Sequence, residues 1–331
     1  MKELMQDIKI KAFKPLYLLF GEERYLVRLY EAKLRDAIVP PAFEAMNMDI
    51  FEGKAVRVED IEIRATTLPF MCERRLLIVR ESGLFAAGRK DESERIAEFF
   101  KHLPPDTVIV FVEDDVDKRS KAYKQAAANG LAVEFSTPSE NELVAWVSRQ
   151  FKEQGKSIMP QNAATLLRYV AFDMYAAASE VAKLSAYIGS AADIAAADIE
   201  AVCVKSVEAR IFELVDAVAN KDAPKALERL DNLLAAKESP LMVIVMIARQ
   251  FRIMLMCKEC AAQGLGTEAT AAATGLRSFV VSAALKQSRG FDEASLINAL
   301  QDCAETDNRI KTGKIQDRLG VEMLIVRHSS R

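Results

Sequence analysis

Short, mainly apolar runs alternate with charged stretches over the first 138 residues of the chain. Several of these runs are uninterrupted, which is typical of strands buried on both faces of a parallel sheet. The predicted strands are Leu16–Phe20, Met48–Phe51, Leu76–Val79, Val108–Val112 and Leu131–Phe135.

The stretches between these runs are compatible with helices. They are Glu22–Ile38, Val58–Thr66, Glu92–His102 and Lys118–Ala128. Alternation of strands and helices implies right-handed crossover connections and a layered α/β structure. We therefore predict a five-stranded parallel sheet domain over residues 1–138.

The pattern changes after Pro138. Ser139 followed by Glu142 is a helix-start signal, and no later run resembles a strand. We predict about three short helices over residues 139–205 and longer helices over residues 206–331. The expected fold class is α/β followed by all-α, in three parts with boundaries near 138 and 205.

Composition limits the classes of function. The chain has 331 residues, 45 basic and 48 acidic, for a formal net charge of −3, and half of its residues are hydrophobic. Such a chain can form a sizeable core, and its charge does not favour coating DNA electrostatically. Contact with nucleic acid would need a local patch or partner subunits.

Targeting signals and disulfides are not expected. The five cysteines of so long a chain do not form a disulfide framework, and the first 13 residues lack the apolar core of a signal peptide. The longest unbroken apolar run, Leu241–Ala248, is far shorter than the ~18 residues of a membrane span. We expect a soluble, cytoplasmic protein that does not contact membranes.

The turn after the first predicted strand has the position of a phosphate-binding loop but not its chemistry. It reads Gly21-Glu22-Glu23, without the Gly-Lys-Ser/Thr sequence that cradles a triphosphate. The two carboxylates would repel phosphates, and they favour the start of a helix. We predict a degenerate loop that binds no nucleotide.

Metal-binding residues are not expected either. Arg80 and Glu81 follow the third strand, where a magnesium-binding aspartate would be needed. The acidic residues Glu113, Asp114, Asp115 and Asp117 are interpreted as capping and solvating a turn. The prediction is that the chain holds no metal and no cofactor.

Catalytic constellations are weak. The two histidines, His102 and His328, are interpreted as exposed or capping residues. Cys257 and Cys260 form a single CxxC inside an apolar helical run, so packed thiols are expected rather than a zinc or redox site. No catalytic residue is predicted.

The segment Thr66–Cys72 contains an apolar cluster in a connecting loop. Pro69 disfavours a helix at Leu68, so Leu68, Phe70 and Met71 fall between a helix and a strand. Apolar side chains in a loop either fold back onto the core or dock a partner. From the residues alone, packing onto the core is the favoured interpretation.

Several segments together resemble the bacterial DNA polymerase III delta subunit. They are PLYLLFGEERYLV, TLPFMCERRLLIV, VIVFVEDDVDKRSKAYK, ESPLMVIVMIARQFRIML, DNRIKTG and the closing Leu319–Ile325. They span nearly the whole chain in the family's order.

The resemblance implies an AAA+-like clamp-loader subunit with a nucleotide-fold domain, a three-helix lid and a helical collar. It implies a non-catalytic chain within a DNA polymerase holoenzyme, which binds no ATP. It implies that Leu68 and Phe70, with Met71 as a weaker neighbour, bind the sliding clamp (beta) and help to open it. The implied partners are the ATP-hydrolysing gamma/tau subunits, delta-prime and primer–template DNA.

Two other functions stay open at this point. One is a divergent AAA+ ATPase that acts on nucleic acid, which the missing Gly-Lys-Ser/Thr sequence disfavours. The other is a Rossmann-type metabolic enzyme, which lacks GxGxxG after the first strand and a placed acid–base pair.

Overall fold

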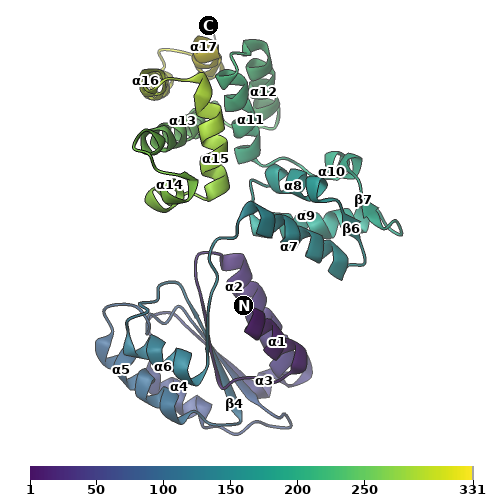
Figure 1. Cartoon of the computed structure of the whole chain (residues 1–331), viewed down its shortest axis with the longest axis vertical. Helices are drawn as coiled ribbons and strands as arrows, with labels where there is room; N and C mark the ends of the chain where they lie inside the picture. The colour runs from purple at the N-terminus through teal and green to yellow at the C-terminus, as the bar shows by residue number, and fades with distance from the viewer. Residues whose placement is uncertain (330–331) are drawn as a thin grey trace. The chain divides into compact units, whose positions relative to one another are not determined.

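The chain folds as two compact units. The computed structural model describes residues 1–329. The first unit comprises Met1–Thr137, and the second begins at Pro138. Each unit is described by itself, with its elements labelled in Figure 1. The further division of the second unit near residue 205 stays a prediction.

A five-stranded sheet forms the centre of the first unit, as predicted. Its order is β2-β3-β4-β1-β5, and each pair of neighbouring strands is parallel. The strands are β1 (Leu16–Phe20), β2 (Met48–Glu52), β3 (Arg75–Arg80), β4 (Thr107–Glu113) and β5 (Leu131–Glu134). Every residue of β1 and β4 is buried, which explains their uninterrupted apolar sequence.

Helices cover both faces of this sheet. Figure 1 shows α1 and α2 on one face and α4, α5 and α6 on the other. On the second face, Ile61 and Ile96 pack with Leu18 and Leu77 of the sheet in one apolar core. The helices are α1 (Lys2–Ile10), α2 (Arg24–Ile38), α4 (Val58–Ala65), α5 (Lys90–Phe99) and α6 (Lys121–Asn129).

The sequence pattern did not predict α1. Leu4 of this helix is fully buried, and Asp7 accepts a hydrogen bond from the Tyr17 hydroxyl at 2.9 Å. Three short helices complete the unit: η1 (Pro41–Phe43), α3 (Glu44–Asn47) and η2 (Phe100–His102).

The start of the second unit contains more helices and strands than predicted. Ser139 forms the expected capping box with Glu142. Residues 140–205 hold four helices rather than three: α7 (Glu140–Glu153), α8 (Pro160–Tyr169), α9 (Met174–Tyr187) and α10 (Ala196–Val202). They also hold two unpredicted two-residue strands, β6 (Ser157–Ile158) and β7 (Asp193–Ile194), which pair in parallel.

The described residues from 206 to 329 are helical, as predicted. The helices are α11 (Val207–Ala219), α12 (Ala223–Ala235), α13 (Pro240–Ala262), α14 (Thr267–Thr274), α15 (Ser278–Gln287), η3 (Ser288–Gly290), α16 (Glu293–Lys311) and α17 (Asp317–Ser329).

Helix α13 is the central helix of this part. Within residues 1–329 it alone is long and apolar enough, by length and composition, to cross a membrane. Val243, Ile247 and Phe251 nevertheless belong to the apolar core that α11, α12, α15, α16 and α17 also build. Core helices of water-soluble proteins pass the same test of length and composition.

Candidate functional site: an exposed apolar loop and a degenerate phosphate loop

Residues 66–74, here called the apolar loop, connect the end of α4 to the start of β3. All five strands are parallel, so a helix-to-strand connection lies at the amino edge of the sheet. The Gly21 turn follows β1 and lies at the opposite, carboxyl edge. The two candidate sites of the first unit are therefore at opposite edges.

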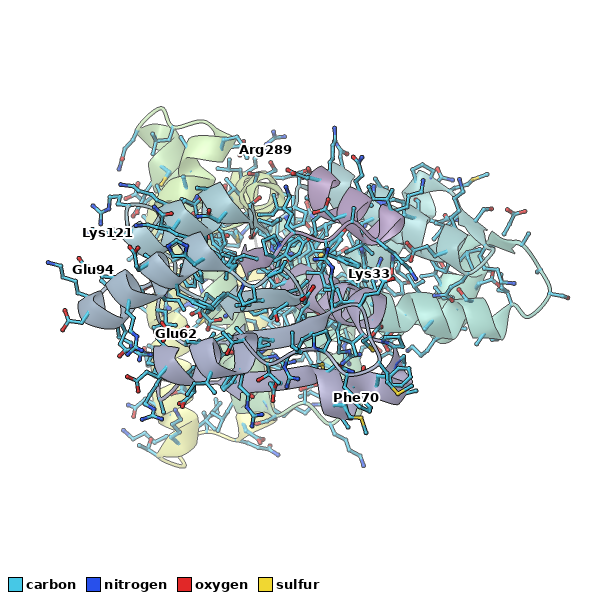
Figure 2. All side chains as sticks on the ribbon, turned by 90° about the horizontal axis from the view of Figure 1, so that it is seen from below. Lys33, Glu62, Phe70, Glu94, Lys121 and Arg289 are labelled. Carbon is cyan, nitrogen blue, oxygen red and sulfur yellow. The ribbon has the colours of Figure 1, made fainter. Side chains whose placement is uncertain are left out.

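The apolar loop presents its large side chains to solvent. Leu68 and Met71 are each 75% exposed, and Phe70 is 54% exposed. Figure 2 shows Phe70 at the outer edge of the ribbon. The interpretation that this cluster packs onto the core is therefore wrong. The Phe70 backbone is hydrogen-bonded to the Asn47 side chain, and Met71 is left-handed (φ 54°), so the loop is held with its apolar side chains outward.

Two further exposed apolar residues lie in segments that are hydrogen-bonded to the loop. Ile63 of α4 is 66% exposed, and its carbonyl accepts from the Thr67 hydroxyl at 3.3 Å. Met46 is 57% exposed and precedes Asn47, which is hydrogen-bonded to the Phe70 backbone. Exposed apolar groups gathered in this way are characteristic of protein interaction sites.

The Gly21 turn is packed tightly against the residues that follow β5. Gly21 has φ +127°, and a Cβ at this position would lie 2.4 Å from the Phe135 carbonyl oxygen. That oxygen accepts from the Glu23 amide at 3.0 Å. The turn is therefore closed onto its own domain.

Both carboxylates of this turn have local partners, as the sequence predicted for a helix start. The buried Glu23 is the N-cap of α2 and accepts from the Tyr25 amide at 3.3 Å. Glu22 accepts from the Thr137 hydroxyl at 2.9 Å. A carboxylate thus already occupies a position where a phosphate would bind the helix N-terminus.

The end of β3 carries an ion-pair cluster. Arg80 Nε donates to Glu31 at 2.8 Å, and Arg28 Nη1 lies 3.1 Å from the same carboxylate. Glu31 is only 4% exposed. Arg28 also pairs with Glu81 at 3.5 Å, so the charges of this cluster balance. The buried Glu31 carboxylate lies between two guanidinium groups and is not available to Mg²⁺.

The acidic residues at the end of β4 and after it also act locally. Glu113 is 1% exposed and accepts from the amides of Ser82 at 3.1 Å and Gly83 at 3.0 Å. Burial raises the pKa of the Glu113 carboxyl despite these bonds. Asp114 pairs with Arg24, and Asp117 accepts from the Arg119 amide at 2.9 Å. Across residues 1–329, no group of three or more His, Cys, Asp or Glu side chains is placed to hold a metal ion.

The structure confirms the interpretation of His102 and corrects that of His328. His102 is exposed, as predicted. The His328 side chain is only 11% exposed and bonds Asp302 at 2.9 Å, because α17 packs against α16. Burial lowers the pKa of His328, and Asp302 only partly offsets this.

The thiols behave as packed side chains. Cys257 and Cys260 lie within α13, and Cys257 is fully buried. Burial raises the pKa of the Cys257 thiol, which disfavours the reactive thiolate.

The second unit contains a cavity of about 480 Å³. Its wall is mainly apolar and aromatic, with charged residues that include Lys205 and Glu213, an ion pair at 2.5 Å. Its lining contains no histidine, cysteine or serine. Of the usual nucleophiles and general bases it offers glutamate, lysine and tyrosine side chains, and among these Glu213 and Lys205 pair with each other. The apolar loop is thus the more informative candidate.

Comparisons with known proteins agree with this architecture. The profile of the family described as DNA polymerase III, delta subunit, matches residues 17–136. The profile described as DNA polymerase III delta subunit, C-terminal domain, matches residues 208–328. The two profiles cover one part of the sheet unit and one part of the helical unit, in that order.

Similar proteins carry the same description. DNA polymerase III subunit delta of Bacillus subtilis (strain 168) is 26% identical over 331 aligned positions, which cover 98% of this chain and 95% of the relative. A probable DNA polymerase III subunit delta of Aquifex aeolicus (strain VF5) is 23% identical over 242 positions, 70% of this chain and 67% of the relative.

The fold is that of a solved clamp-loader protein. The structure of the Bacillus subtilis DNA clamp loader delta protein superimposes with a TM-score of 0.83 at 26% identity, over 100% of this chain and 99% of that one. The fold and these matches define the class of this protein as a clamp-loader subunit of DNA polymerase III. The chain belongs to the family of DNA polymerase III delta subunits.

Proposed function

We propose that this protein is the delta subunit of a bacterial clamp loader, and that its apolar loop binds the ring-shaped sliding clamp and helps to open it. The observation that carries the proposal is the exposure of Leu68, Phe70 and Met71 on one connecting loop. Large apolar side chains stabilise a protein–protein contact when a partner pocket buries them.

The energy of this contact limits the mechanism. Burying Leu68 and Phe70 contributes about 1.5–3 kcal/mol each, whereas a micromolar complex needs about 8 kcal/mol. Other contacts must supply the rest: Met71 of the loop is exposed, and so are Met46 and Ile63 beside it. The loop opens the ring only if it binds the open form more tightly than the closed form.

We further propose that the chain binds no ATP and catalyses no reaction itself. The closed Gly21 turn, the capping Glu23 and the Arg80–Glu31 pair support this proposal. ATP binding and hydrolysis then belong to gamma/tau subunits, which control when the loop is presented.

The remaining expectations concern the assembly. We propose that the helices over residues 206–331 form a collar with the ATP-hydrolysing subunits and delta-prime, that residues 139–205 form a lid, and that primer–template DNA is met within the complex. The proposed location is the cytoplasm.

Clamp binding tests the first proposal. We expect Leu68→Ala/Phe70→Ala to weaken binding of the sliding clamp at least about 100-fold, because both apolar contacts are lost. The matched control is Met159→Ala/Tyr187→Ala, which removes two exposed apolar side chains of the second unit. Equal clamp affinity for native protein and loop variant would refute the proposal.

Nucleotide titration tests the second proposal. A fluorescent ATP analogue with Mg²⁺ is expected to show no saturable binding to the isolated chain. Saturation at micromolar concentration would show that the Gly21 turn opens to admit phosphates, and would contradict the assignment.

A further inference from the structure

Asn47 is a fully buried polar residue beside the apolar loop. It is the last residue of α3 and lies directly before β2. Nothing in the sequence pattern singles out this residue, because its partners in the loop are more than 20 positions away.

Its side-chain amide pairs with both polar groups of the Phe70 backbone. Asn47 Oδ1 accepts from the Phe70 amide at 2.6 Å, and Nδ2 donates to the Phe70 carbonyl at 2.9 Å. Nδ2 also lies 3.1 Å from the Phe43 carbonyl oxygen and 3.4 Å from Cys72 Sγ. One side chain therefore holds Phe70 as a neighbouring strand would.

The loop needs such an anchor at its centre because side-chain hydrogen bonds hold only its ends, through Thr67 and Arg74. Leu68, Phe70 and Met71 point into solvent, so burial does not fix their backbone. Pro69 has no amide hydrogen to donate, and Met71 has a positive φ of 54°, which the surroundings must enforce.

We propose that Asn47 is a positioning residue for clamp binding, which acts by holding the Phe70 backbone so that Leu68 and Phe70 are presented in a fixed conformation. The inference rests on the proposed function of the loop. A preorganised loop loses less conformational freedom on binding. The affinity for the clamp therefore increases although Asn47 itself adds no contact to the clamp.

Affinity measurements on the full chain test the inference. We expect Asn47→Ala to weaken clamp binding about 10-fold in the native background. In the Leu68→Ala/Phe70→Ala background the same change should have no further effect, because Asn47 acts through those side chains. If Asn47→Ala weakens clamp binding by the same factor in both backgrounds, the inference is overturned.

The matched control is Ser82→Ala. Ser82 is also fully buried and hydrogen-bonded, but it follows β3 at the opposite edge of the sheet. It should lower stability and leave clamp affinity unchanged. An equal loss of affinity in Ser82→Ala would reduce the Asn47 effect to general destabilisation and overturn the inference.

Hydrogen exchange provides a readout that needs no variant. The Phe70 amide belongs to a half-exposed residue in a loop, yet its bond to Asn47 predicts slow exchange in the free native protein. Fast exchange would overturn the inference. If instead Leu68→Ala/Phe70→Ala retains native clamp affinity, the proposed function of the loop fails, whatever the exchange rate.

Discussion

At the scale of single residues, the carboxyl edge of the sheet depends on close backbone packing. Gly21 has φ +127° and faces the Phe135 carbonyl, whereas Gly53, after β2, has φ +86° and open space around it. A side chain at either position would strain the backbone, but only a side chain at position 21 would also clash with neighbouring atoms.

Substitution of these glycines should reveal that difference. Gly21→Ala is expected to lower the free energy of unfolding by about 2–5 kcal/mol, because strain and overpacking add. Gly53→Ala should cost only the strain, about 1–2 kcal/mol. Urea denaturation measures both, and similar losses for the two variants would refute the close approach at Gly21.

His328 gives the second unit a defined dependence on pH. Its pKa is lowered by burial below the ordinary value of 6.5, so the folded state binds fewer protons than the unfolded state just below that pH. The stability that the second unit gains from neutral, buried His328 is fully present above about pH 6.5. It is lost as the pH falls towards the lower pKa that His328 has in the folded state.

The melting temperature should therefore fall between pH 7 and pH 5.5, and less so in His328→Gln. Glutamine keeps a polar side chain opposite Asp302 without titrating. An identical pH dependence in the native protein and the variant would show that His328 is not buried in its neutral form.

Sequence reasoning worked for residues whose role is local. The capping role of Glu23 and the packed thiol of Cys257 follow from neighbours in the chain. The buried position of His328 and the contact of Asn47 with Phe70 could not be predicted, because they depend on elements brought together by the fold.

At the scale of elements, burial decides how well a segment can be recognised. Strands β1 and β4 are buried on both faces, and their apolar runs predict their ends to within one residue. Helix α6 begins at Lys121 rather than Lys118, because Ser120 caps it by accepting from the Tyr123 amide at 3.1 Å. Strands β6 and β7 have two residues each, too few for any periodicity.

Helix α13 is apolar around much of its circumference, and its packing predicts which face matters. Phe251 is 1% exposed, whereas Val245 is 56% exposed. We expect Phe251→Ala to cost about 3–5 kcal/mol of stability and Val245→Ala to change it by less than about 0.5 kcal/mol.

Thermal and urea unfolding without detergent check this expectation. If Val245→Ala destabilises the chain as much as Phe251→Ala does, the assigned core face of α13 is wrong.

At the scale of the whole molecule, the two edges of the sheet in the first unit differ in the residues that they carry. The first unit keeps a parallel sheet of the kind that binds nucleotides at its carboxyl edge, but that edge is occupied by Glu23, Glu31 and Arg80. Its exposed apolar loop lies at the amino edge. We infer that partner binding uses the amino edge.

Site-specific cross-linking to the sliding clamp tests this claim most directly. A photoreactive phenylalanine analogue would replace Phe70 in one variant and Arg119 in another; the Arg119 side chain is 90% exposed and follows β4 at the carboxyl edge. We predict a cross-link to the clamp from position 70 and none from position 119. A cross-link from position 119 alone, or from neither position while the clamp stays bound, would show that the amino edge of the sheet does not bind the clamp.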